Sequence, residues 1–229
     1  MTNIQSIALD GHCGAGKSTV AKLVAQKTGL LALDTGAMYR ATALYMLKNG
    51  VDVKDAEAVA ARANEPQISV KNIQGVQHTY LNGSDVSADI RREEVSRAAS
   101  LVATVKAVRV NMVGLQRQIA ESVGVIMDGR DIGTVVLPNA ALKVFLTADP
   151  KERARRRYEE IKNAQDTSYE KVLEDILKRD YNDEHRAESP LKMAEDACLV
   201  DSTHITARQA ADKIIELFNK KTKKQEGIK

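Results

Sequence analysis

Cysteines and aromatic residues are scarce in this sequence, and tryptophan is absent. Cys13 and Cys198 are the two cysteines among 229 residues, which is too few for a disulfide scaffold, and they lack the C-x-x-C spacing of zinc and redox sites. The aromatic residues are 6 tyrosines and 2 phenylalanines, so a platform on which successive nucleic-acid bases stack is not expected. We therefore expect polar groups to recognise any base that binds.

Long apolar runs and a strong net charge are also missing. No apolar stretch reaches the roughly 20 residues of a membrane-spanning helix, and the N-terminal segment has neither the basic nor the apolar part of an export signal. The sequence thus predicts a cytoplasmic protein with no membrane partner. Its 34 basic and 31 acidic residues leave a net charge of +3, which is low for a protein that binds nucleic acid, so no nucleic-acid partner is expected.

The fold class follows from short apolar runs that alternate with helical patterns. Continuous apolar runs of strand length suit parallel strands that are buried on both faces. Residues 18–28 repeat apolar side chains at helical spacing, and Gly29 follows as a helix stop. The sequence predicts an α/β fold with one parallel sheet flanked by helices. Its expected strands are 4–10, 30–34, 123–128, 142–147 and 197–201.

Three segments depart from this alternation. Residues 65–105 are predicted to form an insert that begins with short antiparallel strands, with Asn82-Gly83 as a hairpin turn. Residues 151–165 are rich in arginine and glutamate, and we expect them to form a mobile lid. Residues 221–229 are predicted to be a flexible basic tail. The α/β core is then built from residues 1–64, 106–150 and 166–220.

The segment from Gly11 to Ser18 matches the phosphate-binding pattern G-x-x-x-x-G-K-[ST], directly after an apolar strand and directly before a helix. Glycines let such a loop wrap closely, so that backbone N–H groups and the helix N-terminus point at phosphate oxygens. We expect Lys17 to contact the β and γ phosphates and Ser18 to bind Mg²⁺. The predicted loop comprises Gly11, His12, Cys13, Gly14, Ala15, Gly16, Lys17, Ser18 and Thr19.

A second set of polar residues follows later strands. In the segment DGRD, Asp128 ends an apolar strand, a position that suits an acid orienting Mg²⁺ and its waters. Arg130 suits a phosphoryl group in transfer, although the segment could also be an Asp-Gly turn in solvent. The stretch LDTGAMYR repeats the pattern and places Tyr39 and Arg40 near the start of a helix, where helix capping is the alternative interpretation.

Two helical segments supply further arginines. Arg179, Asp183 and Arg186 are spaced i, i+4 and i+7 on one helix face, which suits either a polar cleft or a solvated salt-bridge ladder. The segment ERARRR has interleaved and neighbouring glutamates, which weakens it as a nucleic-acid patch. We expect its arginines to close over a triphosphate instead, and these are Arg153, Arg156 and Arg157.

Taken together, GHCGAGKST, LDTGAMYR, AASLVATVKAVR, DGRDIGTVV, ERARRR and KRDYNDEHR resemble the bacterial-type cytidylate kinases, within the nucleoside monophosphate kinase group of P-loop proteins. The resemblance extends from Ile4 to about Phe218. It implies a five-stranded parallel core, a small β-rich insert that binds the nucleoside monophosphate, and a helical lid. It also implies transfer of the γ-phosphoryl group of ATP to CMP or dCMP, with Mg²⁺ as cofactor. We expect the protein to be a monomer.

The same resemblance implies roles for individual residues. Three residues are expected to read the cytosine edge: Ser100, Arg109 and Asp131. Five are expected at the acceptor phosphate: Arg40, Arg130 and Arg186, with Thr35 and Tyr39 nearby. Arg179 and Asp183 are expected to face the sugar. Ser18 and Asp128 are the candidate Mg²⁺ ligands, partly through water. The candidate catalytic residues are Lys17, Arg130, Arg153, Arg156 and Arg157.

Other functions remain open on the sequence alone. A kinase for another acceptor, such as UMP, keeps every phosphate argument and changes only the groups that read the base. A nucleotide-dependent switch is less compatible, because the guanine-reading pattern N-K-x-D does not occur. A nucleic-acid module would use the lid arginines and the lysine-rich tail. The family commonly has Pro and a small residue where His12 and Cys13 stand, so the loop backbone is expected to bind phosphate without these side chains.

Overall fold

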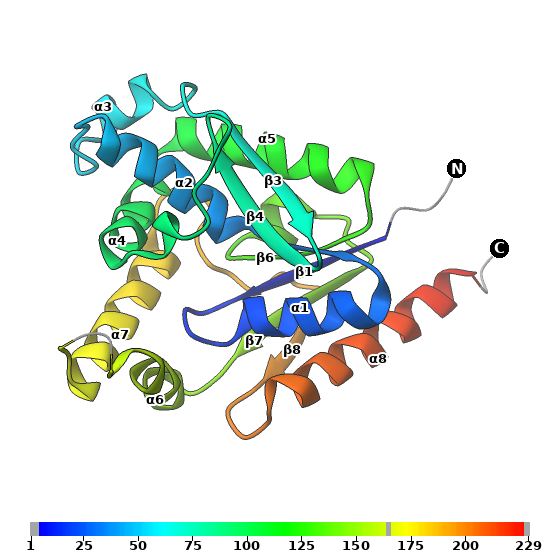
Figure 1. Ribbon diagram of the computed structural model, residues 1–229. Coiled ribbons are helices and arrows are strands. Elements are labelled where there is room, and N and C mark those ends of the chain that lie inside the picture. The colour runs from blue at the N-terminus through cyan, green and yellow to red at the C-terminus, as the bar shows by residue number, and fades with distance from the viewer. Residues whose placement is uncertain (1–4, 164–165, 227–229) are drawn as a thin grey trace.

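The computed structural model describes residues 5–163 and 166–226. The predicted strand residue Ile4, lid residues 164–165 and tail residues 227–229 lie outside the described residues. The described chain contains a five-stranded sheet in the order β2-β6-β1-β7-β8, with all four pairings parallel, and a three-stranded antiparallel sheet (Figure 1). The predicted α/β fold with a five-stranded parallel sheet and a small β-rich insert is confirmed.

The elements follow the predicted alternation. The parallel strands are β1 (Ser6–Gly11), β2 (Leu31–Asp34), β6 (Val125–Gly129), β7 (Leu142–Thr147) and β8 (Cys198–Asp201), and the antiparallel strands are β3 (Ile68–Ile73), β4 (Val76–Leu81) and β5 (Ser84–Asp85). The described helices are α1 (Lys17–Thr28), α2 (Thr35–Lys48), α3 (Ala56–Ala61), α4 (Glu93–Val102), α5 (Lys106–Ser122), α6 (Pro150–Ile161), α7 (Tyr169–His185) and α8 (Ala207–Glu226), with a 3-10 turn at Asp89–Arg91 and a short π-helix at Ile132–Val136.

Helices cover both faces of the parallel sheet, which explains why its strands are apolar throughout. Along β1, Ile7 and Leu9 belong to the core shared with α1 and α8, whereas Ala8 belongs to the core shared with α2, α4 and α5. All three side chains are fully buried. Because each buried aliphatic side chain contributes about 1.5–3 kcal/mol, these two cores hold the strand ends, and thus the site, in fixed positions.

The antiparallel insert packs on the α2 side of the sheet (Figure 1). The Asn82-Gly83 turn joins β4 to β5, and both residues have the positive φ angles, 50° and 84°, that such tight hairpin turns require. Gln74-Gly75 makes the same kind of turn between β3 and β4. Helix α4 is the last element of the predicted insert, and α5 follows it. Both helices share a hydrophobic core with α2.

Helices α6 and α7 lie beyond the carboxyl end of β7, separate from the two sheet-covering layers (Figure 1). Helix α8 continues to Glu226, six residues into the segment predicted as a flexible tail, because Phe218 packs into the core and Thr222 caps the Phe218 carbonyl. Within 5–163 and 166–226, no single helix is long and apolar enough to cross a membrane, and one pair, α4 and α5, meets the length and composition test together while bent by 101°.

Candidate functional site

The phosphate-binding loop connects β1 to α1, and its glycines are required by close packing. Gly11 has a φ of 147°, and a Cβ atom there would lie 1.9 Å from the carbonyl oxygen of Leu146 on β7. Gly16 has a φ of 85° and precedes α1 in the left-handed conformation. A side chain at Gly11 would therefore push the loop off the sheet, and the tight wrap predicted from the sequence depends on this residue.

The Lys17 side chain lies inside the phosphate-binding loop. It is buried, and Nζ donates hydrogen bonds to the carbonyl oxygens of Gly11 at 2.8 Å and of His12 at 2.7 Å. Burial, followed by the positive charge of Arg130, lowers the pKa of Lys17 to about 7. An anion beside Nζ would favour the charged ammonium. A phosphate group bound there would therefore raise the pKa of Lys17 and keep it protonated.

Asp128 and Ser18 meet at the end of β6. Ser18 Oγ donates a hydrogen bond of 2.7 Å to Asp128 Oδ2, and Asp128 is paired across the strands with Asp34 of β2. Burial, and then the negative charge of Asp34, raises the pKa of Asp128 to about 7. A nearby cation would stabilise the ionised form of Asp128. Hydroxyl and carboxylate oxygens are ligands that Mg²⁺ prefers, so these residues fit that ion.

This oxygen pair differs from a metal cage built by protein alone. Within the described ranges, no group of three or more His, Cys, Asp or Glu side chains is arranged to hold a metal ion. Mg²⁺ in nucleotide sites commonly keeps several waters and binds substrate phosphates in addition to one or two protein oxygens. The pair Ser18 and Asp128 has the composition of such a shared site.

A network of arginines and carboxylates lies beside this pair. Arg109 of α5 is ion-paired with Asp131, and Arg186 lies 3.6 Å from the other oxygen of Asp131. Arg130 donates from Nε to Asp183 of α7 at 2.7 Å. Three segments that are distant in sequence, namely α5, the DGRD turn and the end of α7, thus meet at the carboxyl edge of the sheet, where ligands of parallel α/β proteins bind.

The two carboxylates of this network have opposite electrostatic environments. Burial raises the pKa of Asp131 even though Arg109 and Arg186 oppose the effect. At Asp183 burial also acts to raise the pKa, but Arg130 outweighs it and the pKa is lowered. Asp183 is therefore firmly ionised, whereas Asp131 is a desolvated acceptor held between two guanidinium groups.

Other predicted acceptor residues surround the network. Thr35 Oγ1 donates to the Asp128 carbonyl at 2.7 Å, and Arg40 pairs with Asp34 at 2.8 Å. The Tyr39 ring lies 5.7 Å from the Arg109 guanidinium, and burial raises the Tyr39 pKa to about 12. Two further predicted residues, Ser100 and Arg179, are partly buried, and neither makes a side-chain hydrogen bond to another residue in the described part of the chain.

The three predicted lid arginines of α6 lie in three different environments. Arg153 is 2% exposed and hydrogen-bonds the Ala148 and Cys13 carbonyls together with Asp180. Arg156 donates to the Ser202 carbonyl at 2.7 Å and to Glu152. Arg157 is exposed and pairs with Glu160. The structure does not gather them at one point.

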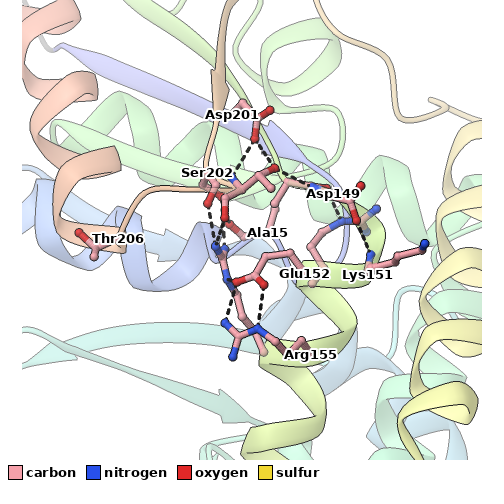
Figure 2. Close-up of polar contacts among 12 residues, drawn as sticks. Ala15, Asp149, Lys151, Glu152, Arg155, Asp201, Ser202 and Thr206 are labelled. Atoms are coloured by element: carbon pink, nitrogen blue, oxygen red, sulfur yellow. Dashed lines mark hydrogen bonds and ion pairs between the residues drawn. The ribbon is translucent and has the colours of Figure 1, made fainter.

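A cavity of about 420 Å³ opens where α6 meets the loop after β8. Ser202 connects this loop to the phosphate loop, since its Oγ lies 3.4 Å from the Ala15 carbonyl oxygen. Figure 2 shows Glu152 and Arg155 of α6 facing Asp201 and Ser202 across this region. The sequence motifs did not reveal the cavity, whose lining residues are Asp149, Lys151, Glu152, Arg155, Tyr169, Thr203 and His204.

Asp10 is another site residue that the motifs did not reveal. It ends β1, is 4% exposed, and accepts the backbone N–H groups of Ile132 at 2.8 Å and Gly133 at 2.7 Å. These groups begin the π-helix that directly follows the DGRD segment, and such short π-helices are frequent at functional sites. An acid at the end of an apolar strand, the signal used for Asp128, also applies to Asp10.

Comparisons with known proteins show which family the chain resembles. The sequence model of the family described as Cytidylate kinase matches residues 7–220. The cytidylate kinase of Caldicellulosiruptor bescii is 47% identical over 221 residues, which cover 96% of this chain and 98% of that protein, and that of Bacillus subtilis is 46% identical over 219 residues, covering 95% and 98%.

A solved structure supports the fold independently of close sequence similarity. The crystal structure of an uncharacterized protein from Eubacterium ventriosum aligns with a TM-score of 0.52 at 14% identity, covering 94% of this chain and 98% of that one. Similarity at this level of identity concerns the fold alone. The family match over residues 7–220 and the full-length relatives go further, and the chain belongs to the cytidylate kinase family.

Proposed function

We propose that the protein transfers the γ-phosphoryl group of ATP to CMP or dCMP by direct in-line transfer, giving ADP and CDP or dCDP. The observation that carries this proposal is the juxtaposition of two anion sites at one sheet edge. Asp10, next to the phosphate loop, is the register partner of Gly129, next to Arg130. A donor triphosphate and an acceptor monophosphate would thus approach each other between neighbouring strands β1 and β6.

The chemistry needs no strong base and no covalent intermediate. The second pKa of a phosphate monoester is near 6, so the acceptor oxygen is largely ionised at neutral pH. The barrier comes instead from repulsion between two anions, and positioned cations lower it. Lys17 serves the donor phosphates, while Arg40, Arg130 and Arg186 serve the acceptor phosphate and the group in transfer.

The proposal includes Mg²⁺ with ATP as co-substrate. Ser18 and Asp128 would hold the ion, partly through water, because they present adjacent hard oxygens beside the start of α1. When bound, Mg²⁺ neutralises charge on the β and γ phosphate oxygens. Asp34 supports this site by its negative charge, and Thr35 keeps the end of β6 in register through the Asp128 carbonyl.

The base readers proposed here are Arg109, Asp131 and Ser100. Cytosine presents an amino donor at N4, whereas uracil has a carbonyl oxygen at the same position. A buried carboxylate such as Asp131 accepts from the amino group and repels the oxygen, because both would be acceptors. Arg109 donates to the acceptor atoms of the same edge. Arg179 and Asp183 would face the sugar and admit both ribose and deoxyribose.

The donor nucleoside fits the cavity of about 420 Å³ beside Ser202. The loop after β8, whose Thr203 and His204 line the cavity, contacts the phosphate loop where Ser202 Oγ meets the Ala15 carbonyl. Arg156, which binds the Ser202 carbonyl, stands at the border of the cavity. Arg157 lies on the exposed surface of α6 in an ion pair with Glu160, and it would exchange this partner for phosphates when the lid closes and excludes water.

The proposal describes a monomer, because all residues assigned to both substrates come from one chain, and it keeps the cytoplasmic location expected from the sequence. The decisive experiment measures ADP release from ATP and Mg²⁺ with CMP, dCMP, UMP, AMP and GMP at equal concentrations. Preference for CMP and dCMP supports the proposed reaction. Preference for UMP would make the protein a kinase for another acceptor, and slow hydrolysis indifferent to all five would indicate a switch or binding module.

A further inference from the structure

A buried ion pair binds the backbone of one phosphate-loop residue at both its N–H and its carbonyl group. Arg153 of α6 donates from its NH1 group to the Cys13 carbonyl at 2.9 Å and to Asp180 Oδ2 of α7 at 2.6 Å. The other oxygen of Asp180 accepts the Cys13 N–H at 3.3 Å. Two helices thus satisfy both polar groups of a single loop residue through side chains that bind each other.

Packing makes this arrangement tight. Arg153 is 2% exposed and Asp180 7% exposed, and Arg153 Nε also donates to the Ala148 carbonyl at 2.8 Å. A Cβ atom at Gly14 would lie 3.3 Å from Arg153 Cβ and 3.7 Å from Ile176 of α7. The loop therefore lies directly against both helices, and the guanidinium of Arg153 is engaged on both its edges with protein groups.

A second contact from the same helix reinforces the first. Glu184 follows Asp180 by one helical turn, and its Oε1 lies 2.9 Å from Nε2 of His12. The His12 ring also packs edge-on against Phe145 at 5.4 Å. Helix α7 therefore contacts two successive loop residues, of which Cys13 is held through its backbone and His12 through its side chain.

We propose that Arg153 and Asp180 are positioning residues: they fix the Cys13 backbone through its N–H and carbonyl groups, and so set the geometry of the phosphate loop for ATP. This assigns Arg153 a different role from the phosphate contact expected of a lid arginine, and it gives a role to Asp180, which the sequence motifs did not single out. The inference rests on the proposed kinase function where it is tested by KM values. Its test by ATP binding requires only that the loop binds ATP.

The pair should act on the donor nucleotide more than on the acceptor. Arg153 and Asp180 both contact the loop at Cys13, four residues before Lys17. In the acceptor network, by contrast, Arg109 lies on α5 and Asp131 lies just after β6. Helix α7 also carries Asp183 of the acceptor network. A variant that merely disturbs α7 would therefore impair both substrates, and a selective effect on ATP separates the two cases.

The test uses Asp180→Asn, which keeps the shape of the side chain but turns one acceptor into a donor facing Cys13 or Arg153. We expect the KM for ATP, and its calorimetric Kd, to rise at least about tenfold, because small misplacements of binding groups have effects of that order. The KM for CMP at saturating ATP should change less than threefold. Lys171→Gln is the matched control, since it removes an exposed ion pair with Glu174 on the same helix.

Arg153→Lys provides a second, milder variant, which keeps the charge but cannot bind Cys13, Ala148 and Asp180 together. The same selective rise for ATP is expected. A lower kcat with an unchanged KM and Kd for ATP would show that Arg153 contacts the phosphoryl group directly, and equal rises for ATP and CMP would show a general role for α7. Either result overturns the inference. If the wild-type protein does not phosphorylate CMP, the proposed function fails, while the ATP titrations still decide this inference.

Discussion

The proposed donor and acceptor halves of the site are built from different kinds of groups. On the donor side, the loop from Gly11 to Ser18 presents backbone groups, and its own side chains point into protein contacts, as His12 does toward Glu184. On the acceptor side, the proposed recognition of the base depends on charged side chains such as Arg109 and Asp131. We therefore expect the donor loop to tolerate sequence change at His12 and Cys13 as long as its backbone path is kept, whereas the acceptor side should not tolerate the loss of single groups.

The two halves share one residue, Arg130. Its positive charge lowers the pKa of Lys17 on the donor side, where burial is the larger cause, and it is ion-paired with Asp183 on the acceptor side. Burial acts to lower the pKa of Arg130, but Asp183 and other negative groups outweigh it and raise the pKa. Arg130 thus remains charged at the point where the phosphoryl group would pass between substrates.

The largest effect is expected when this shared residue is removed. Arg130→Ala should lower kcat by about a thousandfold, in the range measured for arginines that stabilise phosphoryl transfer, while the protein still folds, with a lower melting temperature because Asp183 loses its ion-pair partner. Initial rates of ADP release and thermal unfolding measure the two quantities. Arg97→Ala, at an exposed arginine of α4, is the control. Near-normal turnover would contradict the placement of Arg130 between the substrates.

Asp10 connects the two halves, because it lies beside the phosphate loop and accepts the N–H groups of Ile132 and Gly133 after the DGRD segment. Its raised pKa can be tested by the pH dependence of stability. Burial raises its pKa to about 6 despite hydrogen bonds from Gly133 and Ile132, whereas an unfolded Asp titrates near 3.9. The folded protein therefore binds the proton more tightly, so this group makes stability fall as pH rises from about 4 to 6. A difference of two pKa units corresponds to roughly 3 kcal/mol.

Asp10→Asn removes this titration. The free energy of unfolding of the wild type, measured with urea at several pH values, should decline relative to the variant by roughly 3 kcal/mol between pH 4 and pH 7. The variant should also be less stable at low pH, because its amide nitrogen faces a backbone N–H group. Parallel pH curves for the two proteins would mean that Asp10 does not carry the raised pKa.

A smaller, selective effect is expected on the acceptor side. Asp131→Ala removes the acceptor proposed for the cytosine amino group, so the preference of kcat/KM for CMP over UMP should fall about tenfold, or roughly 1.4 kcal/mol. Ser100→Ala should reduce the same preference less. The measurement compares both acceptors at fixed ATP. An unchanged preference in both variants would show that another group reads the base.

The sequence predicted the fold and the edge of the sheet that carries the site. Apolar runs marked the five parallel strands, and Gly29 ended α1 as expected with a φ of 75°. The meeting of Lys17, Asp128 and Arg130 also followed from the sequence, because the carboxyl ends of parallel strands lie at one edge. These features could be predicted because they depend on local sequence patterns and not on particular tertiary contacts.

The orientation of the lid arginines could not be predicted in this way. Arg153 and Arg157 are separated by one helical turn and lie on nearly the same face of α6, yet one is buried and the other exposed. The difference arises from Asp180, which stands opposite Arg153 on α7. In the sequence Asp180 is one of several charged residues in KRDYNDEHR, and no pattern distinguishes an acid that meets a distant arginine from one in solvent.

The smallest effect is expected on the donor side, at Cys13. Burial acts to raise the pKa of its thiol, but Arg179, Arg130 and Lys17 outweigh it and lower the pKa. Cys13→Ser keeps the N–H and carbonyl groups that Asp180 and Arg153 bind. Because these backbone groups fix the loop, the KM for ATP should change less than about threefold. A tenfold change, measured beside Asp131→Ala, would show that the donor loop also depends on a side chain and would remove the contrast between the two halves.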